Sequence, residues 1–388
     1  MNALKVGTID AGNAAIMTYI HQDPKWPQFT WDSDVLASAL SAVRHKQGKH
    51  LGRMESIGFP LRSEASLEIL TADVVKSWAI EGDELNPGEV RSSIARRLGL
   101  DHAGLPTASR AVDGVVEMML DATQNAKTPL TTERLFGWHA ALFQTGHSGI
   151  HPITVGAWRP AEAGRMQVVS GIIGRKKVHF EAPEASRLDS EMQSFLAWFH
   201  STGDLDPVLK AGIAHLWFVT IHPFEDGNGR IARAIGDMAL ALADGTHERF
   251  YSLSSQIEAE RKRYYDELES AQRGGLDITA WLQWFLACLD RALDGAEESL
   301  AAVLFKARVW GKVNQRPTGE RQRKVLNRLL NGFVGKLTTS KYAKLAKCST
   351  DTALRDIGDL VERGVLIKSQ GGGRSTSYSL REPGSVSG

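Results

Sequence analysis

The stretch that decides the fold runs from His222 to Arg233 and reads HPFEDGNGRIAR. It places an imidazole, a carboxylate, a glycine-rich segment and two arginines within twelve residues. An imidazole titrates near neutrality, so His222 is a candidate base that needs no large pKa shift to take a proton from a hydroxyl group. Asp226 offers the hard oxygen ligand that Mg²⁺ prefers. The combination predicts a site for phosphate chemistry.

The glycine-rich segment predicts an anion-binding loop. Gly227 and Gly229 can adopt positive φ and direct backbone N–H groups at an oxyanion, and Asn228 tolerates the same conformation and adds an amide donor. Apolar residues recur at helical spacing after the loop: Ile231, Ala234, Ile235, Met238 and Leu242. The loop should therefore open a helix whose N-terminus carries partial positive charge. Arg230 and Arg233 lie on one face of its first turn, where cations are unfavourable unless an anion lies between them. The Lys-Ser/Thr pair of a Walker loop is missing.

The segment before His222 predicts a buried helix. Within residues 208–221, Ile213, Leu216, Trp217 and Thr220 recur at helical spacing. His215 precedes His222 by seven residues, which corresponds to about 10 Å along a helix. The two imidazoles therefore cannot share a metal, and His215 is expected to be a packed core histidine.

The nonapeptide from His222 to Arg230 resembles the signature His-x-Phe-x-Asp-Gly-Asn-Gly-Arg of the Fic (filamentation induced by cAMP) family, and Arg233 stands at the place of the family's second arginine. The resemblance implies a helical enzyme that transfers AMP from ATP to a protein hydroxyl group and releases pyrophosphate. His222 would be the base, Phe224 a core anchor and Asp226 the Mg²⁺ ligand. The residues that would hold the phosphates are Gly227, Asn228, Gly229, Arg230 and Arg233.

Two further segments extend the resemblance. Residues 166–180 have short β-branched runs around Gly171 and Gly174, which predict a hairpin. In the family, a hairpin flap precedes a helix, here expected to start near Leu188, and binds the target backbone by strand addition. The flap positions that look nucleotide-facing are Val168, Val169, Ser170 and Gly171, although an ordinary surface hairpin is the alternative.

On the far side of the motif, Tyr264 and Tyr265 resemble the family's aromatic pair near the adenine. Gln272 stands where many relatives have Asn. The glutamine keeps the amide group but carries it on a longer side chain. A plain core role for either tyrosine is the alternative.

Residues 77–82 read SWAIEG and fit the pattern Ser/Thr-x-x-x-Glu-Gly/Asn that marks an inhibitory helix in many Fic proteins. Ser77 and Glu81 share one helix face, and Gly82 is the predicted helix stop. The helix dipole disfavours a carboxylate in the last turn, so Glu81 needs a cation from elsewhere. The resemblance implies that Arg233 is this cation. The alternative is that Glu81 is a solvated surface residue.

Composition limits the function classes. The chain has 388 residues, 42% hydrophobic content and a formal net charge of +1, so charge alone gives no argument for a nucleic-acid partner. Cys288 and Cys348 are the two cysteines and form no metal-binding pattern, which is typical of a reducing cytoplasm without structural zinc. Residues 1–20 lack a secretion signal and no apolar run approaches a membrane span, so we expect a cytoplasmic protein with no membrane partner.

Four parts are expected along the chain. Residues 1–70 form an N-terminal helical extension, residues 71–100 carry the inhibitory helix, residues 105–300 form the Fic core, and residues 320–388 form a separate basic module. The last part contains 13 Lys and Arg against 6 Asp and Glu, a balance of 13 − 6 = +7, which leaves 1 − 7 = −6 for the rest of the chain.

The pattern of this basic module resembles a winged helix-turn-helix. Helices are expected around 325–330, 339–345 and 349–364, followed by a strand from Val365, a turn at residues 371–373 and a strand over 375–380. The helix from Ser349 would be the recognition helix, and Arg374 in the wing would lie near a groove of DNA. The alternative is an interaction or dimerisation module, because four acidic residues dilute the recognition helix: Asp351, Asp356, Asp359 and Glu362.

The sequence therefore predicts a mainly α protein with a small β-hairpin flap. Its predicted function is an ATP- and Mg²⁺-dependent protein adenylyltransferase, inhibited by Glu81, that modifies a Ser, Thr or Tyr hydroxyl of a target protein or of itself. DNA and a second copy of the chain are further candidate partners. A DNA-binding regulator whose core senses a nucleotide is the alternative of another class. Transfer of UMP or phosphocholine, or removal of AMP, are alternatives within the same kind of site.

Overall fold

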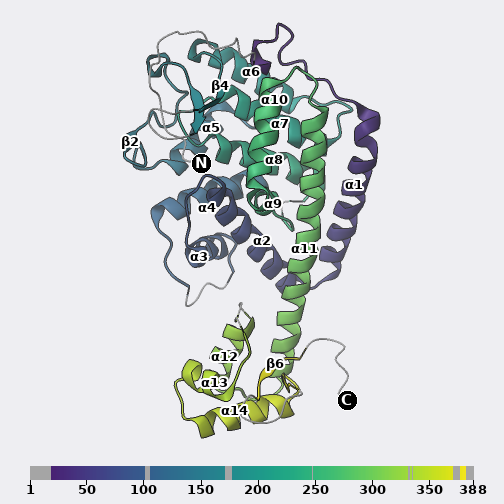
Figure 1. Ribbon diagram of the computed structural model, residues 1–388, viewed down its shortest axis with the longest axis vertical. Helices are drawn as coiled ribbons and strands as arrows, with labels where there is room; N and C mark the ends of the chain where they lie inside the picture. Colours follow the sequence, from purple (N-terminus) through teal and green to yellow (C-terminus); the bar gives the residue numbers. More distant parts are fainter. Residues whose placement is uncertain are drawn as a thin grey trace. The chain divides into compact units, whose positions relative to one another are not determined.

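The computed structural model describes residues 19–100, 105–170, 177–246, 248–330, 333, 335–369 and 376–381. The chain divides into two compact units, of which the first ends at Glu297 and the second begins at Glu298. The described residues are mainly helical, with three two-stranded antiparallel sheets (Figure 1). This confirms the predicted mainly α fold with small hairpins. None of the helices in the described part of the chain is long and apolar enough to cross a membrane.

The described residues of the first unit form helices, three short 3-10 helices and two hairpins. The helices that begin in it are α1 (Ser33–Ser56), α2 (Phe59–Ile80), α3 (Pro87–Arg97), α4 (Arg110–Gln124), α5 (Thr132–Leu142), α6 (Leu188–His200), α7 (Pro207–Ile221), α8 (Asn228–Asp244), α9 (Leu253–Ala259), α10 (Arg261–Arg273) and α11 (Thr279–Val313). The 3-10 helices are η1 (Ile20–Gln22), η2 (Ala161–Ala163) and η3 (Ala185–Arg187). The hairpins pair β1 (His147–Ser148) with β2 (His151–Pro152), and β3 (Gln167–Ser170) with β4 (Lys177–Glu181).

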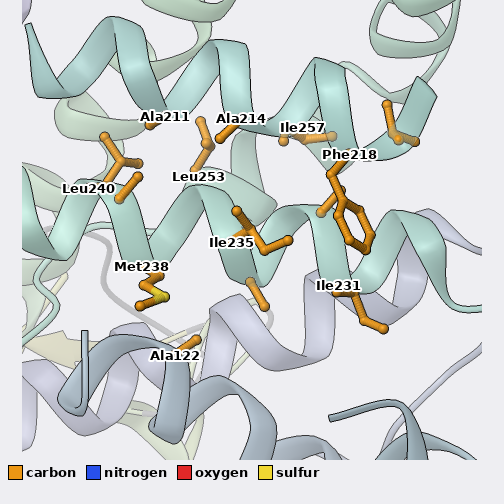
Figure 2. Packing of buried hydrophobic residues seen from close by; sticks show 14 of the residues in the cluster. Ala122, Ala211, Ala214, Phe218, Ile231, Ile235, Met238, Leu240, Leu253 and Ile257 are labelled. Atoms are coloured by element: carbon orange, nitrogen blue, oxygen red, sulfur yellow. The ribbon is translucent and has the colours of Figure 1, made fainter. Parts of the chain in front are cut away.

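The core of this unit is built around α7 and α8, which pack against each other (Figure 2). Every residue of α7 from 211 to 221 is buried, as expected for a helix at the centre of a domain. Figure 2 shows Phe218 on the side of α7 that faces α8, and Met238 on the side of α8 that faces Ala122 of α4. The helix predicted over 208–221 is confirmed, with Pro207 as one additional residue at its start. This packing fixes the connection between α7 and α8, which contains the motif.

Helix α2 brings the predicted inhibitory segment to this core. It runs without interruption from Phe59 to Ile80, through the boundary expected at residue 70, because residues 61–80 contain neither glycine nor proline. Asp73 is buried and accepts hydrogen bonds from the hydroxyl of Ser252 and the backbone N–H of Ser254. These contacts dock α2 on the start of α9, so that its C-terminal end lies beside α8.

The second unit has its own apolar core. Beyond the end of α11 it contains α12 (Glu320–Leu330), α13 (Thr339–Ala346), α14 (Thr350–Glu362) and a hairpin of β5 (Leu366–Lys368) and β6 (Tyr378–Leu380). Ser349 caps α14, and its hydroxyl accepts a hydrogen bond from the backbone N–H of Thr352. Gly364 follows α14 with φ of 67°, as a helix stop requires. The predicted turn at 371–373, Arg374 and Ser375 lie outside the described residues.

Candidate active site

His222 ends α7 in a left-handed conformation with φ of 51°, which is uncommon for a residue other than glycine. Its Nδ1 lies 3.2 Å from the carbonyl oxygen of Val219, which assigns the ring hydrogen to Nδ1 and leaves Nε2 unprotonated. Burial lowers the pKa of His222 to about 4, and the charge of Arg159 contributes to the shift. The sequence predicts no large shift, and burial beside a cation is the reason for the difference. The imidazole is therefore neutral at pH 7 and able to accept a proton.

The loop after His222 is held by its own side chains. The Oδ1 of Asn228 accepts from the backbone N–H of Phe224 at 2.9 Å, and its Nδ2 donates to the carbonyl of Phe224 at 2.8 Å. Gly227 has φ of 81°, whereas Asn228 and Gly229 are the first residues of α8 and do not use the left-handed conformation that their residue types allow. The physical reason is that one left-handed residue is enough to start the helix. The backbone N–H groups at this N-terminus remain suited to an anion.

Asp226 lies in the loop as an ionised carboxylate. Its Oδ2 accepts from the hydroxyl of Ser148 on β1, and its Oδ1 accepts from the backbone N–H of Gly227 at 2.6 Å. Burial alone would raise the pKa of Asp226, but Arg230 and these two hydrogen bonds lower it. A third of the side chain is exposed, so a ligand can reach it.

The chemistry of this carboxylate fits the predicted metal. Mg²⁺ binds through one or two carboxylates and takes its other ligands from water and phosphate oxygens. Among the described residues, no group of three or more His, Cys, Asp or Glu side chains could enclose a metal by itself. Asp226 is therefore suited to a metal that arrives with a phosphate ligand.

Arg233 is buried and reaches across to α2. Its Nε donates to the hydroxyl of Ser77 at 2.9 Å, and its Nη2 donates to the carbonyl of Ser77 at 2.8 Å and to Glu81 at 2.7 Å. The hydroxyl of Tyr265 donates to the carbonyl of Ile80 at 3.2 Å and lies 3.4 Å from Glu81. Helix α2 ends before Glu81, and Gly82 follows with φ of 95°. The structure thus brings Arg233 together with Ser77 and Glu81 of the predicted inhibitory segment, and Gly82 follows the end of the helix.

Glu81 also lies against the first turn of α8. A Cβ atom on Gly229 would lie 2.5 Å from the Oε1 of Glu81, so a glycine is required for this close approach. Arg230 is buried beside it, with its guanidinium 4.3 Å from the ring of Trp78 and 5.0 Å from the ring of Phe143. The Nε of Arg230 and the Nη1 of Arg233 are buried and have no hydrogen-bond partner within the described ranges. Each of the two guanidinium groups therefore has one buried nitrogen that is able to donate a hydrogen bond to an anion.

The other predicted site residues are divided between the flap and the core. Val168, Val169 and Ser170 lie on β3, whereas Gly171 and Gly174 lie outside the described residues. The hydroxyl of Tyr264 is 3.0 Å from the Nε2 of His215, which is buried as predicted. Gln272 is also buried and donates to Thr220 at 3.3 Å. These contacts fit the core role that was left open for Tyr264, while an adenine contact for Tyr265 and Gln272 stays a prediction.

Two residues that the motif did not indicate support the loop. The Nε of Arg159 donates to the carbonyl of His222 at 2.9 Å, and its Nη2 donates to the carbonyl of Pro183, just after β4. The ring of His139 stacks on Phe224 with 4.2 Å between centroids, and its Nε2 lies 3.3 Å from the carbonyl of Asp226. Their partners are 63 and 87 positions away in the chain, so no local pattern could have identified them.

The chain is similar to known proteins and domain families over part of its length. Residues 129–240 match the Fic/DOC family, and residues 19–100 match a domain of unknown function, DUF4172. The chain is 28% identical to a protein named protein adenylyltransferase Fic from Aedes aegypti over 235 residues, and 28% identical to its namesake from Drosophila melanogaster over 265 residues. These matches cover 59% and 67% of the chain but 42% and 46% of the relatives, so the chain spans less than half the length of both.

A solved structure is similar over most of the chain. It is the crystal structure of a Fic family protein from Desulfovibrio desulfuricans G20, with a TM-score of 0.51 and 20% sequence identity. The similarity covers 92% of this chain and 99% of that one. At this identity the likeness concerns the fold.

Proposed function

Since this chain belongs to the Fic family, we propose that it transfers AMP from ATP to a Ser, Thr or Tyr hydroxyl group of a protein and releases pyrophosphate. The observation that supports the proposal most is His222, which is neutral, has its Nδ1 engaged and has its Nε2 left to accept a proton. It is followed within one loop by an ionised carboxylate and the N-terminus of a helix. The names of the similar proteins agree with this activity.

The geometry suggests a role for each residue in the transfer reaction. As the target oxygen bonds to the α-phosphorus, the Nε2 of His222 accepts the hydroxyl proton, and the bond from the α-phosphorus to the pyrophosphate oxygen breaks. The N-terminus of α8 and Arg230 would stabilise the charge that develops on the phosphates. When bound at Asp226, Mg²⁺ would neutralise charge on the departing pyrophosphate. The clamp of Asn228 on Phe224 keeps these groups in place before substrate binds.

We also propose that Glu81 inhibits this reaction. With Glu81 in place, Nη2 of Arg233 is engaged and the carboxylate occupies the space above Gly229. Arg233 then has only its Nη1 left for the γ-phosphate of ATP, and we expect ATP to bind in an unproductive pose. Departure of Glu81 would leave the arginine free for the phosphate.

One experiment tests the proposed transfer against its alternatives. The purified chain is incubated with Mg²⁺ and ATP, UTP or CDP-choline, each labelled in the group to be transferred, with and without cell lysate. Labelled protein from ATP alone is the expected result. Label from UTP or CDP-choline would replace AMP by another group, and loss of label from previously labelled protein would indicate removal of AMP. Absence of any label in all reactions would contradict the proposal.

A second candidate function concerns the second unit, for which we propose DNA binding. Three of the four acidic residues that argued against DNA binding form ion pairs with arginines of the same unit. Asp356 lies 3.2 Å from the Nε of Arg321, and Asp359 lies 3.0 Å from the Nη1 of Arg363. Of the four, Asp351 and Glu362 stay exposed, at the two ends of α14, and Glu362 lies 3.5 Å from Arg316. The outward face of α14 then offers Arg355 and, at Gly358, open space for close approach, and four exposed lysines lie on or next to α13: Lys336, Lys341, Lys344 and Lys347.

Charge reversal tests this surface in the full chain. Lys344→Glu combined with Arg355→Glu should remove retention of duplex DNA in a low-salt gel-shift assay, because phosphate contacts dominate such binding and make it fall steeply with salt. Truncation before Glu320 should have the same effect. Lys49→Glu, an exposed position on α1, is the control for a single charge reversal away from this surface. Absence of any shift by the unaltered chain at low salt would favour an interaction module instead.

A further inference from the structure

A serine, a histidine and a glutamate form a hydrogen-bonded chain between the flap and α10. The Oγ of Ser170 lies 2.5 Å from the Nε2 of His179, and the Nδ1 of His179 lies 2.5 Å from the Oε2 of Glu269. An ionised carboxylate can only accept, so the hydrogen of the ring lies on Nδ1 and Nε2 is left to accept from the hydroxyl of Ser170. A hydroxyl, a base and an acid that orients the base form the arrangement of an activated nucleophile.

The flap is built so that His179 takes this position. Val168 pairs with Phe180 and Val169 pairs with Val178, so His179 is the extra residue of a β-bulge in β4. A bulge turns a side chain away from the regular alternation of a strand. Arg273 of α10 fixes the bulge, since it donates to the carbonyl of Val178 at 2.7 Å and to that of His179 at 2.9 Å. The imidazole is therefore oriented from both its backbone and its ring.

The charges around Glu269 favour the same arrangement. Burial alone would raise the pKa of Glu269, but the hydrogen bond from His179 and the charges of Arg273 and Lys177 lower it. The side chains of His179 and Glu269 are 14% and 20% exposed, so both are largely shielded from water. Ser170 stands at the end of this chain and is half-buried.

The chain of three residues lies next to the candidate active site. Glu269 follows Tyr265 by four positions on α10, so the two side chains share a helix face, and Tyr265 contacts Glu81. On the other side, Arg159 links the carbonyl of His222 to Pro183, just beyond β4. The flap that carries Ser170 is thus tied to the site at two places.

We propose that Ser170 is the residue on which this protein places AMP on itself, with His179 as the base for that hydroxyl. The inference rests on the proposed function and names its internal acceptor. The Oγ of Ser170 bonds to the α-phosphorus of ATP, and the bond from that phosphorus to the pyrophosphate oxygen breaks. The hydroxyl proton passes to the Nε2 of His179, and pyrophosphate leaves.

Peptide mapping tests the acceptor without altering the flap. The full chain carrying Glu81→Gly is incubated with ATP and Mg²⁺ in the presence of cell lysate, and both its own peptides and the lysate proteins are analysed by mass spectrometry. AMP is expected on Ser170. Ser190 is the matched control, because it is an exposed serine whose hydroxyl contacts a backbone carbonyl of Arg187 and no histidine.

Variants of the chain test the role of His179. In the Glu81→Gly background, His179→Asn should slow modification of Ser170 by about 10²-fold relative to the label on lysate proteins in the same reaction, the usual scale for loss of a base. Glu269→Gln should slow it less, because the amide oxygen still accepts from the ring. Arg165→Gln, an exposed position just before β3 whose ion-pair partner is Glu181 and not Glu269, should leave that ratio unchanged.

The possible failures are distinguishable. Labelled lysate proteins with an unmodified Ser170 would overturn this inference and leave the proposed function intact. Equal losses of both labels in His179→Asn would show a damaged flap and overturn the role of His179 as base. No label on any protein would overturn the proposed function together with this inference.

Discussion

The loop after His222 and the end of α2 meet at the first turn of α8, but they are held in different ways. Asn228 bonds both backbone groups of Phe224, whose ring is fully buried and stacked on His139. Glu81, by contrast, is 29% exposed and is followed by a glycine in a left-handed conformation. The loop is held by buried contacts, and loss of any one of them would lower the free energy of unfolding. The end of α2 depends on a few polar contacts near water, so it can leave while the loop stays in place.

The largest effect is expected from the loop itself. His222→Ala should lower labelling of lysate proteins from ATP by about 10²-fold or more, because the hydroxyl proton loses its acceptor. Since the pKa of His222 is about 4, transfer by the unaltered chain should decline only as the pH falls toward that value and the imidazole becomes protonated. Titration calorimetry should show that ATP still binds the variant. His45→Ala, on the exposed side of α1, is the control. Undiminished labelling by His222→Ala would refute the role.

The second largest effect is expected on stability, and it tests whether the Asn228 side chain holds the loop in place. Asn228→Ala leaves a buried N–H and a buried carbonyl of Phe224 unpaired, which should lower the free energy of unfolding by about 2–4 kcal/mol. Guanidinium unfolding followed by tryptophan fluorescence reports on the first unit, because nine of the ten tryptophans precede Glu298. Asn125→Ala, at an exposed helix end, should cost less than about 1 kcal/mol. Equal stability of the two variants would remove the contrast between the regions.

A smaller effect is expected at the end of α2. Glu81→Gly frees Arg233 and should raise self-labelling from ATP by roughly tenfold, the scale of one hydrogen bond to a charged group. Adding Arg233→Ala should cancel most of the gain, because both substitutions act on one interaction and cannot be additive. Glu84→Gly, an exposed carboxylate three residues further along, is the matched control. If Glu81→Gly leaves labelling unchanged in a folded protein, Glu81 is only the solvated end of a helix.

The smallest effect concerns Tyr265. Tyr265→Phe removes the hydrogen bond to Ile80 and the contact with Glu81 but keeps the ring, so self-labelling should rise by roughly two- to fivefold, as expected for about 0.5–1 kcal/mol. The gain should disappear in the Glu81→Gly background. A gain of the same size in that background would mean that Tyr265 acts on the nucleotide and not on α2. Initial rates of self-labelling measure both cases.

What the sequence predicted correctly is what neighbouring residues determine. The helix before His222 follows from its apolar spacing, and the end of α2 follows from Gly82. The role of the Asn228 side chain was missed, because nothing in the residue type says that it turns back on Phe224. Arg159 and the chain from Ser170 to Glu269 were missed because they depend on contacts between distant segments. Such contacts exist only once the helices have packed.

The close approach of Glu81 to Gly229 has a consequence for how the protein responds to nucleotide. The docked carboxylate and a bound phosphate would compete for the same helix N-terminus, so each must weaken the binding of the other by the same factor. If the docked state were favoured about a hundredfold, the apparent Kd for productively bound ATP would rise by about a hundredfold. The fraction of competent molecules would then follow the ATP concentration itself. Through the contact between Glu81 and Gly229, the activity of the protein would report the concentration of ATP.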